Sequence, residues 1–215
     1  MINVIIENKD SLYRQGMIMV ISQLLDSISE EETIFTDVVD ENITSIADII
    51  VKHFHPGESA LCHPVLQVRK ADSIIIGTYD GSNPPHLGVL PLCFSNIIFI
   101  NRKDSLEKVK ELIFRGWEER YLNNSSPLKR SCGSCQHCTL SPQQASVAAQ
   151  IYSGKKTEHI AEDLNISYKT VNSHKYMIMR KFNLYTEHEL FSFLNLLKSQ
   201  ATSPNFFNVN LRRIF

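Results

Sequence analysis

The strongest structural signal in this chain is the segment from Leu140 to Lys181, LSPQQASVAAQIYSGKKTEHIAEDLNISYKTVNSHKYMIMRK. It opens with a capping box, in which Ser141 caps a helix, Pro142 takes the first helical position and Gln144 reaches back to the cap. Gly154 predicts the end of this helix, because glycine readily adopts the left-handed conformation common at helix ends.

Two further helices are expected in the same segment. The second begins near Thr157, and Asn165 suits its left-handed end. Ser167 is expected to cap the third. The side facing the core is predicted from residues at helical spacing: Val147, Ala148, Ile151, Ile160, Ala161, Leu164, Val171, His174, Ile178 and Phe182.

The third helix also has an outward stripe of polar, basic and aromatic residues. Its members are Lys169, Asn172, Ser173, Tyr176 and Arg180. A short helix, a tight turn and a helix with a basic outer face are what the major groove requires: cations for phosphates, and Asn, Ser and Lys for base edges. The alternative is an ordinary three-helix bundle whose polar face meets only solvent.

This segment resembles the output domains of LuxR-type (FixJ/NarL) transcriptional regulators. The resemblance rests on Leu140, Gly154, Glu158-x-Ile160-Ala161-x-x-Leu164-x-Ile166-Ser167, Lys169-Thr170-Val171 and His174. The variant Lys-Thr-Val-x-Ser-His-Lys is similar to the enterobacterial branch that includes the Rcs capsule-synthesis auxiliary regulator and the glutamate-decarboxylase acid-resistance activator. Basic residues follow Thr-Val in the broad family, whereas Asn172 and Tyr176 stand here. The resemblance therefore implies a helix-turn-helix regulator that binds double-stranded DNA, without indicating the target sequence.

We expect eight residues of the third helix to contact DNA. Those predicted to face bases or adjacent phosphates are Lys169, Thr170, Asn172, Ser173 and Tyr176, and those predicted to hold the backbone are Lys175, Arg180 and Lys181. The charge distribution agrees with this assignment. Residues 1–126 hold 11 Lys and Arg against 18 Asp and Glu, a net of −7, while residues 127–215 hold 11 against 5, a net of +6.

Composition indicates an ordinary globular protein with room for two modest domains. The chain has 215 residues, of which 43% are hydrophobic and 21% charged. No apolar run approaches the length of a membrane span, and the start of the chain lacks the pattern of a secretion signal. We therefore expect a cytoplasmic protein with no membrane partner.

Residues 1–122 are predicted to form an α/β domain, a doubly wound parallel sheet. Short β-rich runs alternate with helical patterns, at 2–6, 33–39, 48–54, 73–78 and 96–100. Ser11 is expected to cap the first helix, and the last helix is expected over 106–121.

This order resembles the receiver domain of two-component response regulators, but the residues of its active site are changed. Aligning the two places the acidic pair on Asn8 and Lys9, the phosphorylated aspartate on His53, and the receiver lysine on Lys103. Receiver chemistry needs carboxylates for Mg²⁺ and a carboxylate nucleophile. We expect a degenerate receiver, or pseudo-receiver, that is not switched by aspartyl phosphate and serves in dimerisation or partner docking. The alternatives are a ligand sensor and a receiver with a different alignment.

Two histidines stand close together near the end of the third β-rich run. His53 and His55 are expected in a loop at the carboxyl end of a strand, where doubly wound sheets bind ligands. One hypothesis is that these histidines have a pH-responsive or metal-binding role, since histidine titrates near neutrality. The other reading is that they are plain loop histidines.

Residues 123–139 are expected to be a linker that carries a cysteine cluster. Cys132, Cys135 and Cys138 have C-x2-C-x2-C spacing, which suggests a zinc or iron–sulfur site in a reducing compartment. Such a site needs a fourth ligand, from His137, another cysteine or a second chain. The alternative is a thiol-bearing tether with no cofactor.

A fourth helix completes the domain at 140–200, before a tail at 201–215. A second capping box, from Thr186 to Glu189, opens this helix. The resemblance implies that it forms a dimer interface, to which we assign Leu190, Phe193, Leu194 and Leu197. The alternative is that these residues only close the core of the bundle.

The sequence thus predicts a sequence-specific transcriptional regulator that acts as a dimer. Its partner is either a second copy or a response regulator of similar shape. The rival functions are a metal- or redox-sensing regulator that uses the cysteine cluster, and an auxiliary subunit that works only with a response regulator. An enzyme is not expected, because no Ser/His/Asp or Cys/His pairing and no glycine-rich phosphate loop is found.

Overall fold

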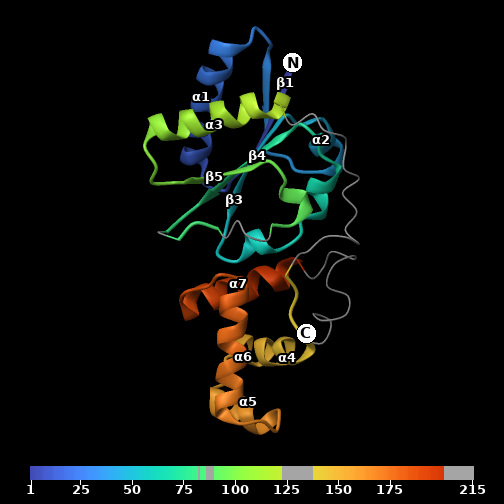
Figure 1. Ribbon diagram of the computed structural model, residues 1–215, viewed down its shortest axis with the longest axis vertical. Helices are drawn as coiled ribbons and strands as arrows, with labels where there is room; N and C mark the ends of the chain where they lie inside the picture. Colours follow the sequence, from blue (N-terminus) through green and yellow to red (C-terminus); the bar gives the residue numbers. More distant parts are fainter. Residues whose placement is uncertain (82, 86–89, 123–137, 201–215) are drawn as a thin grey trace. The chain divides into compact units, whose positions relative to one another are not determined.

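The computed structural model describes residues 1–81, 83–85, 90–122 and 138–200. By its internal contacts the chain divides into two compact units, one built on the N-terminal sheet and one on the C-terminal helices. Each unit is described by itself (Figure 1). No helix within the described ranges has the length and apolar character needed to cross a membrane.

The N-terminal unit is built on a five-stranded parallel sheet with the strand order β2-β1-β3-β4-β5. The strands are β1 (Ile2–Glu7), β2 (Thr33–Thr36), β3 (Ile49–Phe54), β4 (Ile74–Tyr79) and β5 (Ile97–Asn101). The order reverses between β1 and β3, as in doubly wound folds of the receiver type. The predicted α/β fold class is confirmed, and every expected strand is present with small shifts of its ends.

Two long helices cover one face of this sheet. They are α1 (Ser11–Ile28) and α3 (Leu106–Leu122), whose inner residues pack with Val4, Ile6, Val51 and Ile76 in one core. The short helix α2 (Glu41–Ile46) lies on the opposite side (Figure 1). The predicted cap of α1 was wrong by one residue, because Asp10 accepts the hydrogen bond of the Tyr13 amide and Ser11 is already helical.

No α-helix forms between β3 and β4 or, within the described part of that connection, between β4 and β5. Three 3₁₀ turns stand there instead: η1 (Glu58–Ala60), η2 (Pro64–Val68) and η3 (Leu92–Phe94). The buried guanidinium of Arg69 joins these connections. It donates to the carbonyl and hydroxyl of Ser73 at 2.7 Å each, to the hydroxyl of Ser95 at 3.0 Å and to the Ser95 carbonyl. A side chain thus supplies the hydrogen bonds that close these irregular segments.

The C-terminal unit consists of α4 (Pro142–Tyr152), α5 (Thr157–Asp163), α6 (Tyr168–Lys181) and α7 (Glu187–Gln200). Both predicted capping boxes form, at Ser141 with Gln144 and at Thr186 with Glu189. The inner residues of α4, α5 and α6 pack as expected, with Val147, Ile160 and Val171 at 0–1% exposure.

Three of these helices end in the same way. Gly154, Asn165 and Asn183 have φ angles of +76°, +50° and +55° and follow α4, α5 and α6. After α5, the amide of Ile166 donates back to the carbonyl of Ala161 at 3.0 Å. This closing hydrogen bond turns the chain sharply between α5 and α6 and fixes the angle of the helix-turn-helix.

Candidate nucleic-acid interface

The helix α6 is anchored at its start and along its inner face. The hydroxyl of Ser167 accepts the amide of Thr170 at 3.0 Å, which confirms the predicted cap. Val171 and Ile178 are buried at 1% and 0% exposure. A helix held at one end and on one side presents its other side in a fixed orientation.

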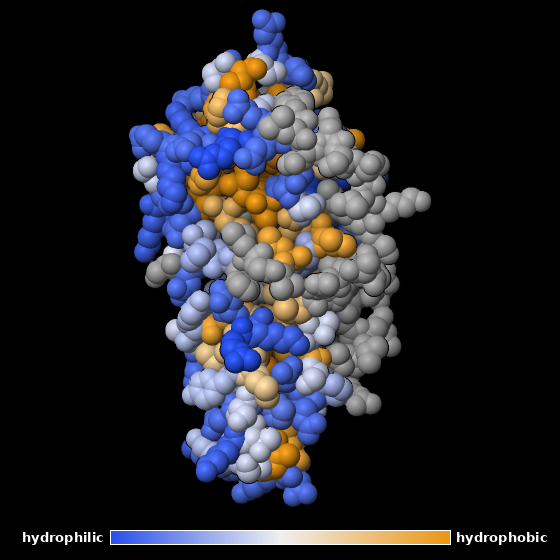
Figure 2. Space-filling view, viewed as in Figure 1, coloured by the Kyte–Doolittle hydropathy of each residue, from blue (hydrophilic) through white to orange (hydrophobic). Residues whose placement is uncertain are grey.

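The outward stripe predicted for α6 lies at the surface. Lys169, Ser173, Tyr176 and Arg180 are exposed, and Asn172 is half-buried. In the view of Figure 2 the surface over α5 and α6 is mostly hydrophilic. Residues three and four apart on a helix stack above one another, so this stripe forms one continuous strip of donors and cations.

The four predicted cations of α6 differ in their surroundings. Lys169 and Arg180 form no ion pair within the described part of the chain. Lys175 lies 2.7 Å from the carboxylate of Glu187, and its side chain is only 16% exposed. Lys181 donates to the carbonyl of Thr139. Two cations are therefore available to a ligand at once, and two must first leave an internal partner.

Two hydroxyl groups among the predicted DNA-contacting residues, those of Ser173 and Thr170, also have local partners. Ser173 donates to the carbonyl of Lys169 at 2.9 Å, and the hydroxyl oxygen of Thr170 lies 2.8 Å from that of Ser167. Each hydroxyl oxygen still has acceptor capacity. These contacts hold both side chains in one rotamer.

The structure adds Tyr168 to the candidate residues. It is 51% exposed and occupies the first position of α6. Its spacing of four residues from Asn172 and eight from Tyr176 extends the same row. The helical period of the sequence contains this signal, but Tyr168 lies beside the cap and was not included in the prediction.

The four residues assigned to a dimer interface lie inside the C-terminal unit. Leu190, Phe193, Leu194 and Leu197 are 0–3% exposed and pack in its core. Their burial favours the alternative that they close the core of the bundle, and their assignment to a dimer interface stays a prediction. The exposed side of α7 instead presents Phe191, which is 46% exposed and stacks on Tyr152 at a centroid distance of 5.7 Å.

A charged cluster occupies the edge of the sheet where a receiver would be phosphorylated. Arg102, just after β5, pairs with the carboxylate of Asp10 and lies 3.6 Å from that of Asp80. Its guanidinium also stacks 4.4 Å from the ring centroid of Tyr13. Asn8 and Lys9 follow β1 as predicted, but Lys103 is exposed and the cation within the cluster is Arg102.

His53 belongs to the same edge. It lies within β3, so the prediction of a loop position was wrong for this residue. Its Nε2 is 3.6 Å from Asp80, and its Nδ1 is 3.3 Å from the hydroxyl of Thr78. His55 follows the strand, as expected.

Two pKa values reflect this arrangement. The Tyr13 amide hydrogen bond and the neighbouring Arg102 lower the pKa of Asp10. Burial raises the pKa of Tyr13. Asp10 is therefore ionised and Tyr13 neutral across the physiological range, which keeps the pair with Arg102 intact.

The cysteine cluster can be described only at its last member. Cys132 and Cys135 lie outside the described residues, and Cys138 is a free thiol. Burial raises the pKa of Cys138, and its thiol donates to the carbonyl of Lys181 at 3.8 Å. No group of three or more metal-binding side chains occurs within the described ranges. A zinc or iron–sulfur site at this cluster stays a prediction.

Comparison with protein families identifies the C-terminal unit. Residues 138–194 match the family GerE, described as bacterial regulatory proteins, luxR family. This part of the chain is therefore a LuxR-family helix-turn-helix domain, as the resemblance predicted. No curated protein matches the chain.

Solved structures resemble the chain over nearly all of its length. A complex of the two-component response regulator RcsB with DNA has a TM-score of 0.55 and 17% identity, and covers 90% of this chain and 98% of that chain. The structure of two RcsB dimers bound to two parallel DNAs has a TM-score of 0.51 and 20% identity, and covers 90% of this chain and 98% of that chain. RcsB from Salmonella enterica serovar Typhimurium, bound to the promoter P1flhDC, has a TM-score of 0.52 and 15% identity. This match covers 90% of this chain and 97% of that chain. At these identities the likeness shows the fold, a receiver-like sheet domain joined to a helical domain.

Proposed function

We propose that this chain, whose residues 138–194 form a LuxR-family domain, is a sequence-specific DNA-binding transcriptional regulator. The observation that carries the proposal is the outer face of α6, where Lys169, Ser173, Tyr176 and Arg180 are exposed along one side. Entering the major groove, Asn172 and Tyr176 contact base edges, while Lys169 and Arg180 contact phosphates. That similar folds occur in RcsB–DNA complexes supports the same role here.

The active form in this proposal is a dimer. Two α6 helices one helical turn apart read the two halves of a site, as in other helix-turn-helix proteins. The second subunit is another copy of this chain or a response regulator of similar shape. The function is regulatory binding and not catalysis, and we place it in the cytoplasm.

Control of the protein does not use aspartyl phosphorylation in this proposal. Asn8 and Lys9 stand where the acidic pair of a receiver is expected, and His53 replaces the carboxylate nucleophile. The carboxylates of Asp10 and Asp80 do lie at this edge, but both contact the guanidinium of Arg102. A divalent cation would have to displace that guanidinium, so the internal ion pairs oppose Mg²⁺ binding.

Selection of genomic DNA fragments by the purified chain tests this function directly. The selection is run at near-physiological salt with the chain alone, with RcsB alone and with both proteins. One palindromic site recovered by the chain alone indicates a homodimer. An asymmetric site recovered only with both indicates an auxiliary subunit. Recovery of no site beyond those that RcsB selects alone overturns the proposal.

Salt dependence provides an independent check of the binding mode. Each phosphate contact lowers the slope of log K against log salt by about 0.9. The chain should therefore lose affinity steeply between 50 and 200 mM salt, on the order of 10³-fold for six contacts. An affinity that does not change with salt would contradict a phosphate-binding surface on α6.

A further inference from the structure

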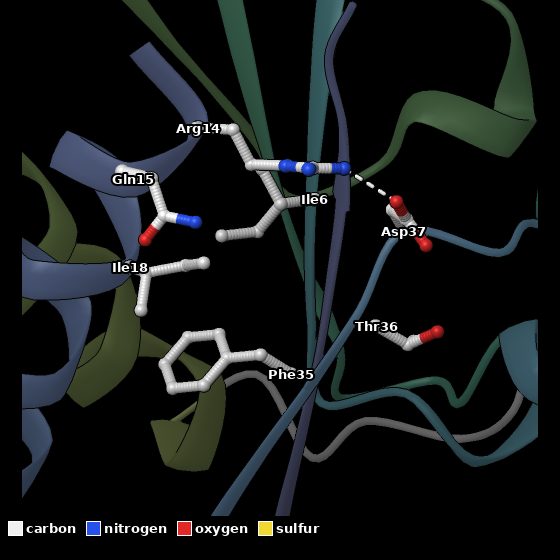
Figure 3. Close-up of a pocket in the computed structure, with 7 residues that line it drawn as sticks. All are labelled: Ile6, Arg14, Gln15, Ile18, Phe35, Thr36 and Asp37. Carbon is white, nitrogen blue, oxygen red and sulfur yellow. Dashed lines mark hydrogen bonds and ion pairs between the residues drawn. The ribbon is translucent and has the colours of Figure 1, made fainter. Parts of the chain in front are cut away.

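A pocket of about 260 Å³ opens in the N-terminal unit between α1 and the end of β2. Figure 3 shows its lining. Ile6 comes from β1, Arg14, Gln15 and Ile18 from α1, and three residues from β2 and the turn after it, namely Phe35, Thr36 and Asp37. The pocket lies at the carboxyl end of the strands, where doubly wound sheets bind ligands.

The pocket has an apolar part and a charged part. Ile6, Ile18 and Phe35 supply the apolar part, with Ile6 almost fully buried and the other two half-buried. At the other side, the guanidinium of Arg14 pairs with the carboxylate of Asp37 (Figure 3). The two charged side chains are 30% and 59% exposed, so both can exchange partners with a solute.

This combination excludes several classes of ligand. A metal cation would meet the guanidinium of Arg14, and a phosphate would meet the carboxylate of Asp37. A purely apolar molecule would contact only the apolar part of the pocket and would make no use of the ion pair between Arg14 and Asp37. The volume lies below the ~300–1,000 Å³ of pockets that hold drug-sized ligands, so the ligand is smaller than these.

We propose that this pocket binds a small zwitterion with an apolar side chain, such as a free aliphatic or aromatic α-amino acid. Its carboxylate accepts two hydrogen bonds from Arg14, since guanidinium and carboxylate match in shape. Its ammonium group donates to Asp37. Its side chain covers Ile18 and Phe35, and the amide of Gln15 faces the same space. Each member of the internal ion pair thus exchanges one charged partner for another of the same sign.

Isothermal titration calorimetry of the full chain with L-leucine and L-phenylalanine tests the proposal. Three probes each lack one feature: leucinamide lacks the carboxylate, N-acetyl-leucine lacks the ammonium group, and glycine lacks the side chain. Binding of leucine or phenylalanine, at least tenfold weaker for all three probes, is expected. Absence of binding by both amino acids at millimolar concentration overturns the proposal, and so does equal binding of leucinamide.

Variants assign the binding to this pocket. Arg14→Gln and Asp37→Asn should each weaken binding of leucine at least tenfold, and Ile18→Trp should block it by filling the pocket while the ion pair remains. Arg115→Gln is the matched control, because Arg115 pairs with Glu111 on α3 outside the pocket. Thermal unfolding confirms that each variant is folded. Unchanged affinity in folded Ile18→Trp would place the ligand elsewhere and overturn the proposal.

Discussion

The Nζ atom of Lys175 lies 2.7 Å from the Oε1 atom of Glu187, which is the first residue of α7. The hydrogen bond from Lys175 lowers the pKa of Glu187, which keeps this carboxylate ionised until the pH falls through that lowered value. The ion pair is therefore complete at neutral pH. A cation on the proposed DNA-binding helix is thus partly neutralised by the helix that follows it.

Replacing Glu187 by Gln should tighten DNA binding. The substitution releases Lys175 to a phosphate and removes a negative charge from beside the DNA, so the slope of log K against log salt should steepen by up to about 0.9. Fluorescence anisotropy with a selected DNA fragment, measured at several salt concentrations, gives both quantities. Glu118→Gln on α3 makes the same change in net charge at an exposed site and serves as the control. Equal effects from both variants would show that only net charge matters.

Asn172 and Lys169 should differ in how their loss affects recognition. Asn172→Ala should reduce discrimination between the selected site and single-base variants by about 1–3 kcal/mol, if its amide reads a base edge. Lys169→Ala should weaken binding to all DNA sequences alike, because Lys169 contacts phosphate in the proposal. It should also reduce the slope of log K against log salt by about 0.9. Binding to a panel of single-base variants separates the two. Unchanged discrimination in Asn172→Ala would assign this residue to the backbone.

The features that sequence predicted well are local ones. The capping boxes at Ser141 and Thr186 and the left-handed Asn165 each depend on residues within one helical turn. The inner face of α6 also follows from a simple period. Such features are fixed by neighbouring side chains and backbone, so a short segment contains the whole signal.

The features that sequence missed depend on distant residues. From the sequence, Lys175 was predicted to be available to DNA. The structure shows that it pairs with Glu187, which is twelve residues later in the chain. Leu194 was correctly placed on an apolar stripe, but periodicity does not say whether its own chain or a second chain covers that stripe. Likewise Arg102 and Lys103 are neighbours in sequence, and only the turn after β5 determines which one meets Asp10.

Arg69 should be among the most important residues for stability of the N-terminal unit. It is 4% exposed and donates hydrogen bonds to the carbonyl and hydroxyl groups of Ser73 and Ser95. Arg69→Ala leaves buried carbonyls without donors, so we expect a loss of about 3 kcal/mol in the free energy of unfolding. Arg69→Lys should rescue little, because an ammonium group cannot reach both Ser73 and Ser95. Urea unfolding measures the stability of both variants. Arg115→Ala is the control, because Arg115 belongs to an exposed ion pair and its loss should change the free energy of unfolding by less than about 1 kcal/mol.

Leu194 and Phe191 distinguish core packing from subunit contact on α7. Leu194→Ala should lower the free energy of unfolding by about 2–5 kcal/mol, because it leaves a cavity in the core. Phe191→Ala should affect that stability little and instead weaken self-association, if the exposed side of α7 contacts a second subunit. Urea unfolding and light scattering over a range of protein concentrations separate the effects. Loss of the dimer in folded Leu194→Ala, with none in Phe191→Ala, would support the predicted interface at Leu190, Phe193, Leu194 and Leu197.

Arg102 should determine how the N-terminal unit responds to Mg²⁺ and phosphoryl donors. With the guanidinium in contact with Asp10 and Asp80, millimolar Mg²⁺ should leave the midpoint of thermal unfolding unchanged, and acetyl phosphate should add no phosphoryl group detectable by intact mass. Arg102→Ala leaves two carboxylates without this cation, so its unfolding midpoint should rise with Mg²⁺, because a ligand that binds only the folded state stabilises it. Lys103→Ala is the matched control, since Lys103 is exposed and forms no ion pair among the described residues. A phosphoryl adduct on the unaltered chain would contradict the proposed loss of receiver chemistry. If Mg²⁺ does not change the midpoint of thermal unfolding of Arg102→Ala, the two carboxylates do not form a cation site even without the guanidinium.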